Sequence, residues 1–83
     1  SSIINIEKNL LNVFPNPTSN VLNIDFTKKN NYSLSFVDVN GRILISKNVI
    51  NNISLDISSF NKGIYFLLVK SDEDFVIKKI KIE

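Results

Sequence analysis

The sequence contains no cysteine and no histidine, and these two absences exclude several kinds of protein. Without cysteine, no disulfide framework and no thiolate metal site can form, so packing alone must hold the fold together. Nucleophilic triads of the Ser-His or Cys-His type cannot be built either. Acid–base chemistry would rest on Asp, Glu, Lys or Tyr, and the acidic residues fall on separate predicted strands and turns. We therefore expect a protein that is not an enzyme and uses no cofactor.

Arginine and long apolar runs are also scarce. Arg42 is the one arginine among ten cationic residues, and the net charge is +2. Nucleic-acid-binding domains need a concentrated basic stripe, usually with arginines and stacking aromatics. No apolar run approaches the roughly 20 residues of a membrane-spanning helix, and no signal peptide opens the chain. The sequence predicts neither nucleic-acid binding nor a membrane span, and we interpret the chain as a piece of a longer exported protein.

The residues that the sequence does contain favour β-strands. Thirty-six of its 83 residues are apolar or aromatic, and 13 of these are Ile and seven are Val. Branched side chains suit a pleated sheet and lose rotamer freedom in a helix. Thirteen Asn and ten Ser residues supply turns between the apolar segments. A chain of this length forms one domain with a single core.

Alternation of apolar and polar residues predicts about seven short strands. We expect them at residues 10–14, 21–26, 32–39, 42–49, 52–58, 64–69 and 75–82. A helical turn at residues 58–63, ended by Gly63, is expected to place Phe60 in the core. Residues 1–9 have no clear period and are expected to be a linker or a frayed leading strand, followed by a folded domain at residues 10–83. With no helix of normal length, the prediction is a small immunoglobulin-like antiparallel β-sandwich.

The dipeptide Asn40-Gly41 predicts a hairpin with a two-residue type I′ turn. In that register Val39 faces Arg42, Asp38 faces Ile43, Val37 faces Leu44 and Phe36 faces Ile45. One side of the hairpin is then expected to face the core, with the residues Tyr32, Leu34, Phe36, Ile43, Ile45 and Val49. Three apolar residues are left outside the core: Val37, Val39 and Leu44. The Asp38 carboxylate is expected to accept hydrogen bonds from the turn backbone, with Arg42 or a lysine as a nearby partner.

The segment at residues 64–69 is apolar on both faces. Tyr65, Leu67 and Val69 point one way, with the Tyr65 hydroxyl reaching a backbone group, and Ile64, Phe66 and Leu68 point the other way. Such excess apolar surface on a small domain commonly marks a contact with a partner. Our hypothesis is that one of two apolar faces docks onto another protein, either Val37, Val39 and Leu44 or Ile64, Phe66 and Leu68.

The last strand, at residues 75–82, departs from simple alternation. A bulge near Lys78-Lys79 would turn Phe75 and Ile77 inward together with Ile80 and Ile82 and push the lysines out. The three lysines near the C-terminus would then border the docking face: Lys78, Lys79 and Lys81. The preceding acidic group at residues 72–74 lacks the spaced ligands and glycine of a calcium loop and is interpreted as a solvated hairpin turn.

Four short motifs follow one another in a fixed order along the chain. They are Pro15-Asn16-Pro17, Asp38-Val39-Asn40-Gly41-Arg42, Lys62-Gly63-Ile64-Tyr65 and Lys78-Lys79. This ordered set, from about Asn12 to Glu83, resembles the C-terminal sorting domain of type IX secretion cargo proteins, the type A or Por secretion tail family of Bacteroidota. Each motif alone is weak, and the order and spacing make the set specific.

The resemblance implies a seven-stranded immunoglobulin-like sandwich at the end of a larger cargo protein. It implies a sorting signal that directs the upstream cargo across the outer membrane by protein–protein recognition, to the cell surface or the medium. The implied partners are the outer-membrane translocon, a shuttle protein and a sortase. Family positions carried over are Pro15, Asn16, Pro17, Asp38, Gly41, Arg42, Gly63, Tyr65 and Lys79.

The alternative function is a cell-surface carbohydrate-binding or adhesive immunoglobulin-like module. Sugar sites usually present exposed aromatic platforms, whereas most aromatics of this sequence are expected to face inward. An inert spacer between domains is a third possibility.

Overall fold

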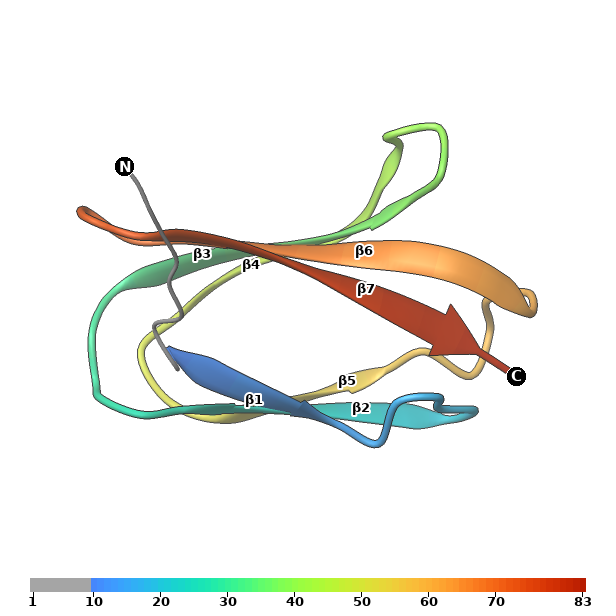
Figure 1. The fold of residues 1–83 in the computed structure, drawn as a ribbon, viewed down its shortest axis with the longest axis horizontal. Helices are drawn as coiled ribbons and strands as arrows, with labels where there is room; N and C mark the ends of the chain where they lie inside the picture. The colour runs from blue at the N-terminus through green and yellow to red at the C-terminus, as the bar shows by residue number, and fades with distance from the viewer. Residues whose placement is uncertain (1–9) are drawn as a thin grey trace, which may run out of the picture.

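The structure is a computed structural model that describes residues 10–83, and the prediction for residues 1–9 lies outside the described residues. Two antiparallel sheets pack face to face, as Figure 1 shows. The three-stranded sheet has the order β1-β2-β5, and the four-stranded sheet has the order β4-β3-β6-β7. The strands are β1 Leu11–Phe14, β2 Val21–Phe26, β3 Tyr32–Asp38, β4 Ile43–Val49, β5 Ile53–Asp56, β6 Gly63–Lys70 and β7 Phe75–Ile82. The predicted all-β sandwich is confirmed.

The distribution of strands between the two sheets is immunoglobulin-like. In immunoglobulin sandwiches, strands one, two and five share one sheet and strands three, six and seven share the other. The same division is found here, and β4 pairs with β3 at the edge of the second sheet. Tyr65, near the start of β6, donates its hydroxyl hydrogen to the Asn61 carbonyl at 2.7 Å. This contact matches the tyrosine corner of such folds and confirms the prediction for Tyr65.

The core lies between the sheets and is built from alternate residues of the strands. Phe36 is fully buried and stacks on Tyr65 and Phe60, with ring centroids 5.2 and 5.7 Å away. The buried cluster consists of Leu10, Leu11, Leu22, Ile24, Tyr32, Leu34, Phe36, Leu55, Ile57, Tyr65, Leu67, Val69, Ile80 and Ile82. Phe60 packs against it as predicted, although its backbone forms a hydrogen-bonded turn to Ile57 and no helix. Gly63 begins β6 at a φ of 149° and does not end a helix.

The predicted type I′ turn in the β3–β4 hairpin is wrong. Gly41 N–H donates to the Asp38 carbonyl and Asp38 N–H donates to the Arg42 carbonyl, so three residues form the loop. Val39 and Asn40 are therefore the central residues of the β-turn, and Gly41 follows at a φ of 86°. A turn followed by a left-handed glycine is the usual three-residue alternative to a two-residue hairpin. Asn-Gly allows both loops, and the sequence alone does not separate them.

The longer loop shifts the pairing by one residue, and a bulge then restores it. Val37 faces Ile43, whereas Phe36 still faces Ile45 as predicted, so Leu44 is the extra residue of β4. Because each shift by one residue exchanges the two faces of a strand, Ile43 and Leu44 trade places. Ile43, predicted in the core, is 59% exposed, and Leu44, predicted outside, packs against the core. Both predictions are corrected.

The predicted bulge in β7 is also wrong. The pairing of β6 with β7 is continuous from Gly63 opposite Ile82 to Lys70 opposite Phe75. Strict alternation therefore holds, with Ile80 and Ile82 buried and Phe75 and Ile77 on the opposite face. Lysine can occupy inward-facing positions because β7 is an edge strand, where a side chain reaches water without passing through the core.

The Pro-Asn-Pro segment, which follows β1 of the three-stranded sheet, is hydrogen-bonded to β7 of the four-stranded sheet. The Asn16 side-chain amide donates to the Lys79 carbonyl at 2.9 Å, and its oxygen accepts from Lys81 N–H at 3.2 Å. Thr18, which is 4% exposed, continues the contact as a parallel bridge to Ile82. Its N–H donates to the Lys81 carbonyl and its carbonyl accepts from Glu83 N–H. We call residues 15–18 the latch. The contact of this segment with β7 was not predicted from the sequence.

Candidate functional site

The most unusual surface of the described domain is the side of the four-stranded sheet that faces away from the core, which we call the outer face. Residues directly opposite one another in neighbouring strands point to the same side, so the register defines the face. From β4 across β3 and β6 to β7, its three rows are Ile43, Val37, Phe66 and Lys79; Ser46, Ser35, Leu68 and Ile77; and Asn48, Ser33, Lys70 and Phe75. Ile64 and Lys81 extend the face at one end.

Apolar side chains occupy the centre and the β7 side of the outer face. Val37 lies between Ile43 and Phe66 and is only 6% exposed, although it does not belong to the core cluster. Its neighbours cover it, and they remain open to water themselves. Ile77 and Phe75 are 56% and 61% exposed. Contiguous apolar area of this kind is uncommon on a small monomeric domain unless it meets a partner.

The structure places the apolar residues that were predicted to contact a partner in different parts of the domain. Val37, Phe66 and Leu68 share the outer face, and Val39 lies in the exposed turn of the β3–β4 hairpin. Figure 1 shows this hairpin tip rising above the four-stranded sheet. Leu44 lies on the core side and leaves the set. Val37 from one proposed face and Phe66 and Leu68 from the other thus belong to a single face in the folded domain, because β3 and β6 are neighbours in the sheet.

Sequence reasoning missed Ile43, Ile77 and Phe75 as members of this face. The assumed bulge had turned Ile77 and Phe75 inward, and the assumed two-residue turn had placed Ile43 in the core. A strict two-residue period along β7 would have identified Ile77 and Phe75, since both are at odd positions together with Lys79 and Lys81.

The lysines give the outer face a positive charge. Lys70, Lys79 and Lys81 lie on it, and its described strand positions carry no acidic residue. Lys81 forms an exposed ion pair with Glu83 at 3.2 Å, and such pairs contribute little to stability. Lys78, opposite Leu67, points to the other side of the sheet and is exposed along the free side of β7. The arrangement favours a partner surface that is both apolar and acidic.

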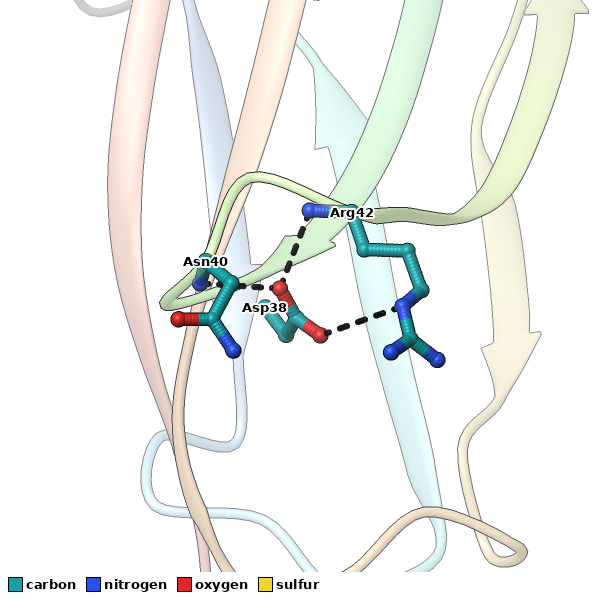
Figure 2. A network of polar contacts seen from close by, with 3 residues as sticks. All are labelled: Asp38, Asn40 and Arg42. Carbon is teal, nitrogen blue, oxygen red and sulfur yellow. Dashed lines mark hydrogen bonds and ion pairs between the residues drawn. The ribbon is translucent and has the colours of Figure 1, made fainter.

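The Asp-X-X-Gly-Arg motif shapes the hairpin at the end of this face. Asp38 Oδ1 accepts hydrogen bonds from the N–H groups of Asn40 at 2.9 Å and of Arg42 at 3.0 Å, as Figure 2 shows. Its other oxygen lies 3.9 Å from Arg42 Nε, and the arginine side chain is 76% exposed. The prediction that Asp38 is held by the turn backbone is confirmed. The carboxylate therefore sets the loop conformation, and the exposed ion pair adds little.

The groups with shifted pKa values lie away from the outer face. The pKa of Tyr32 is raised by burial and, to a lesser degree, by the negative charge of Asp74. The pKa of Asp56 is lowered by hydrogen bonds from the Ser58 hydroxyl and the Ser58 N–H. Within residues 10–83, no three acidic side chains gather where they could bind a metal ion. The same part of the chain contains no helix suited to crossing a membrane.

Comparison with protein families identifies this arrangement of strands and motifs. Residues 12–83 match the family described as the secretion system C-terminal sorting domain. The match begins at Asn12, the second residue of β1, and runs to the last residue, so it includes the latch, the Asp38 hairpin and strands β2 to β7. The resemblance stated from the motifs is confirmed. A search of curated proteins finds no match.

Proposed function

Because the chain belongs to the family of secretion system C-terminal sorting domains, we propose that its outer face is the surface through which the type IX secretion machinery recognises it. The family supplies a sorting signal for proteins that reach the cell surface or the medium, and it is not a family of enzymes. The observation that carries the proposal is the apolar, lysine-bordered face on a domain whose other sheet side is already filled by the core.

In this proposal the domain directs an upstream cargo protein across the outer membrane by protein–protein recognition. Exposed apolar groups contribute affinity when a partner removes them from water, at about 25 cal/mol per Å². The lysines steer the encounter and select an acidic rim. The occupant we propose is a component of the secretion machinery, either the translocon or its shuttle protein, that presents apolar residues among carboxylates. A sortase would act on the tail after this recognition.

An export assay tests the proposal. Residues 10–83 are fused to the C-terminus of a periplasmic reporter, because Leu10 and Leu11 are buried and belong to the core. The host is a bacterium with a type IX secretion system. The variants Ile43→Ser and Ile77→Ser change side chains that are more than half exposed, so the fold should tolerate them. We expect the intact tail to export the reporter and the double variant to leave it in the periplasm.

Ile50→Ser is the matched control, since Ile50 is 60% exposed and belongs to none of the rows of the outer face. It should be exported like the unchanged tail. Export of the double variant at the normal level would contradict the assignment of the outer face. Failure of the intact tail to export, together with binding of the domain on a glycan array, would instead support the carbohydrate-binding alternative.

A further inference from the structure

The latch covers only one half of the free edge of β7. Four backbone groups there are bonded to the latch: the Lys79 carbonyl to Asn16, the Lys81 N–H to Asn16, and the Lys81 carbonyl and Glu83 N–H to Thr18. All four belong to odd-numbered residues. Successive residues of a strand direct their N–H and carbonyl groups to opposite sides. The even-numbered residues of β7 therefore bond to β6, and the backbone groups of the odd-numbered residues point to the free edge.

The other half of this edge is open in the described domain. By this alternation, three residues direct backbone groups to the open half: Ile77 its N–H and carbonyl, Lys79 its N–H, and Phe75 its backbone groups. Among residues 10–83, no strand pairs with this stretch, since β7 ends the sheet and the latch begins at Lys79. An unpaired row of N–H and carbonyl groups is a template for a further strand.

We propose that the open half of the β7 edge, Phe75 to Lys79, accepts an extended acidic segment of a partner protein as an additional β-strand. Backbone hydrogen bonds would provide affinity, and the alternating side chains would provide specificity, as in other cases of strand addition. This inference deepens the proposed function and rests on it, because it names the mode in which the secretion machinery would bind.

The side chains beside the open edge define the sequence of the added strand. Lys79 on the outer face and Lys78 on the other side are adjacent in sequence and exposed, and neither has a carboxylate partner within the described residues. Ile77 and Phe75 follow as exposed apolar residues. An antiparallel partner therefore carries two consecutive acidic residues opposite Lys79 and Lys78, then apolar residues opposite Ile77 and Phe75. The latch limits the site, because beyond Lys79 the edge is occupied.

A second copy of this chain fits the open edge less well. Antiparallel pairing confined to Phe75–Lys79 would place Phe75 and Val76 of the copy opposite Lys79 and Lys78, so neither lysine would meet a carboxylate. Edge lysines commonly prevent pairing between identical strands. The same charges that disfavour a second copy favour an acidic segment from another protein.

A peptide titration followed by NMR tests this inference. The probe is the capped peptide Thr-Glu-Glu-Val-Thr-Val-Thr, which places its two glutamates opposite Lys79 and Lys78. The control peptide has both glutamates replaced by lysine. We expect shifts of the backbone amides of Ile77 and Lys79 with the acidic peptide. The control should bind at least about tenfold more weakly, which corresponds to 1.4 kcal/mol.

Two variants at one position separate the backbone edge from the side chains. Ile77→Pro removes an N–H that points to the free edge, so no bond to β6 is lost, and proline is tolerated in edge strands in that orientation. Ile77→Thr keeps the N–H and the branched shape. We expect binding to be lost in the proline variant and retained in the threonine variant. If the proline variant does not fold, methylation of the peptide amides that would face β7 is the substitute, and it should abolish binding.

Several results would overturn the inference. They are shifts centred on Val37 and Phe66 instead of Ile77, equal binding of both peptides, full binding by the proline variant or the methylated peptide, no binding, or concentration-dependent dimers paired through β7. None of these depends on export. Normal export of a tail that carries Ile77→Pro would also contradict strand addition and leave the proposed function intact. Failure of the intact tail to export would contradict the proposed function itself.

Discussion

The latch offers the most specific test of the fold. Asn16→Ala deletes a side-chain amide that bonds both to the Lys79 carbonyl and to the Lys81 N–H. A typical hydrogen bond contributes about 0.5–1.5 kcal/mol net. Both bonds lie at the surface, where water can replace the lost partner, so we expect a loss of about 1–2 kcal/mol in the free energy of unfolding. A domain of this size has a total of roughly 4–12 kcal/mol, so the variant should remain folded.

Urea unfolding followed by circular dichroism measures this loss, and hydrogen exchange locates it. The Lys81 amide should exchange faster in Asn16→Ala, because its acceptor is gone. Asn16→Asp keeps that acceptor and loses the donor to Lys79, so protection of the Lys81 amide should be largely kept. Asn12→Ala is the control, since Asn12 is exposed on β1 and its side chain makes no hydrogen bond in the described part of the chain. Asn16→Ala with the normal urea midpoint and normal Lys81 protection would refute the role of the latch.

Three further predictions concern the turn, the core and the response to pH. Gly41→Ala forces a side chain into a left-handed conformation at a φ of 86° and should cost about 1–2 kcal/mol, measured by urea unfolding. Phe36→Ala removes a fully buried ring with two aromatic neighbours and should cost about 3–5 kcal/mol, and a normal urea midpoint would show that the stack adds nothing. The lowered pKa of Asp56 contributes stability above its unfolded pKa that is lost as pH falls through the folded value, below about pH 4. Ser58→Ala should raise this pKa in an NMR titration, and an unchanged pKa would contradict the assigned cause.

The strands were predictable because their signals are local. Leu22 and Ile24 in β2, and Leu67 and Val69 in β6, alternate with residues of the other face, and a sheet buried on one side imposes that period. The Tyr65 contact could also be inferred, since a tyrosine buried at a strand start needs a partner for its hydroxyl. The family, too, was visible in the order and spacing of four motifs.

The faces of individual residues near turns were less predictable. Ile43 and Leu44 exchanged sides because the loop contained one residue more than expected and a bulge followed it. Two- and three-residue loops are both common in hairpins and give different registers, so the turn residues alone do not fix which side chains face the core. In β7, the position of the lysines was misjudged because their exposure was attributed to a bulge. Lysine at an edge needs no bulge to reach water.

Composition and periodicity by themselves determined an all-β fold without thiol or imidazole chemistry, and the ordered motifs determined the family. Both follow from properties that neighbouring residues express without long-range contacts. Only the tertiary structure decided that Val37 and Phe66 share one face and that Asn16 reaches Lys79 and Lys81, more than sixty residues away. Such pairings arise when two sheets close over one core, because closure brings together segments whose local patterns carry no information about each other.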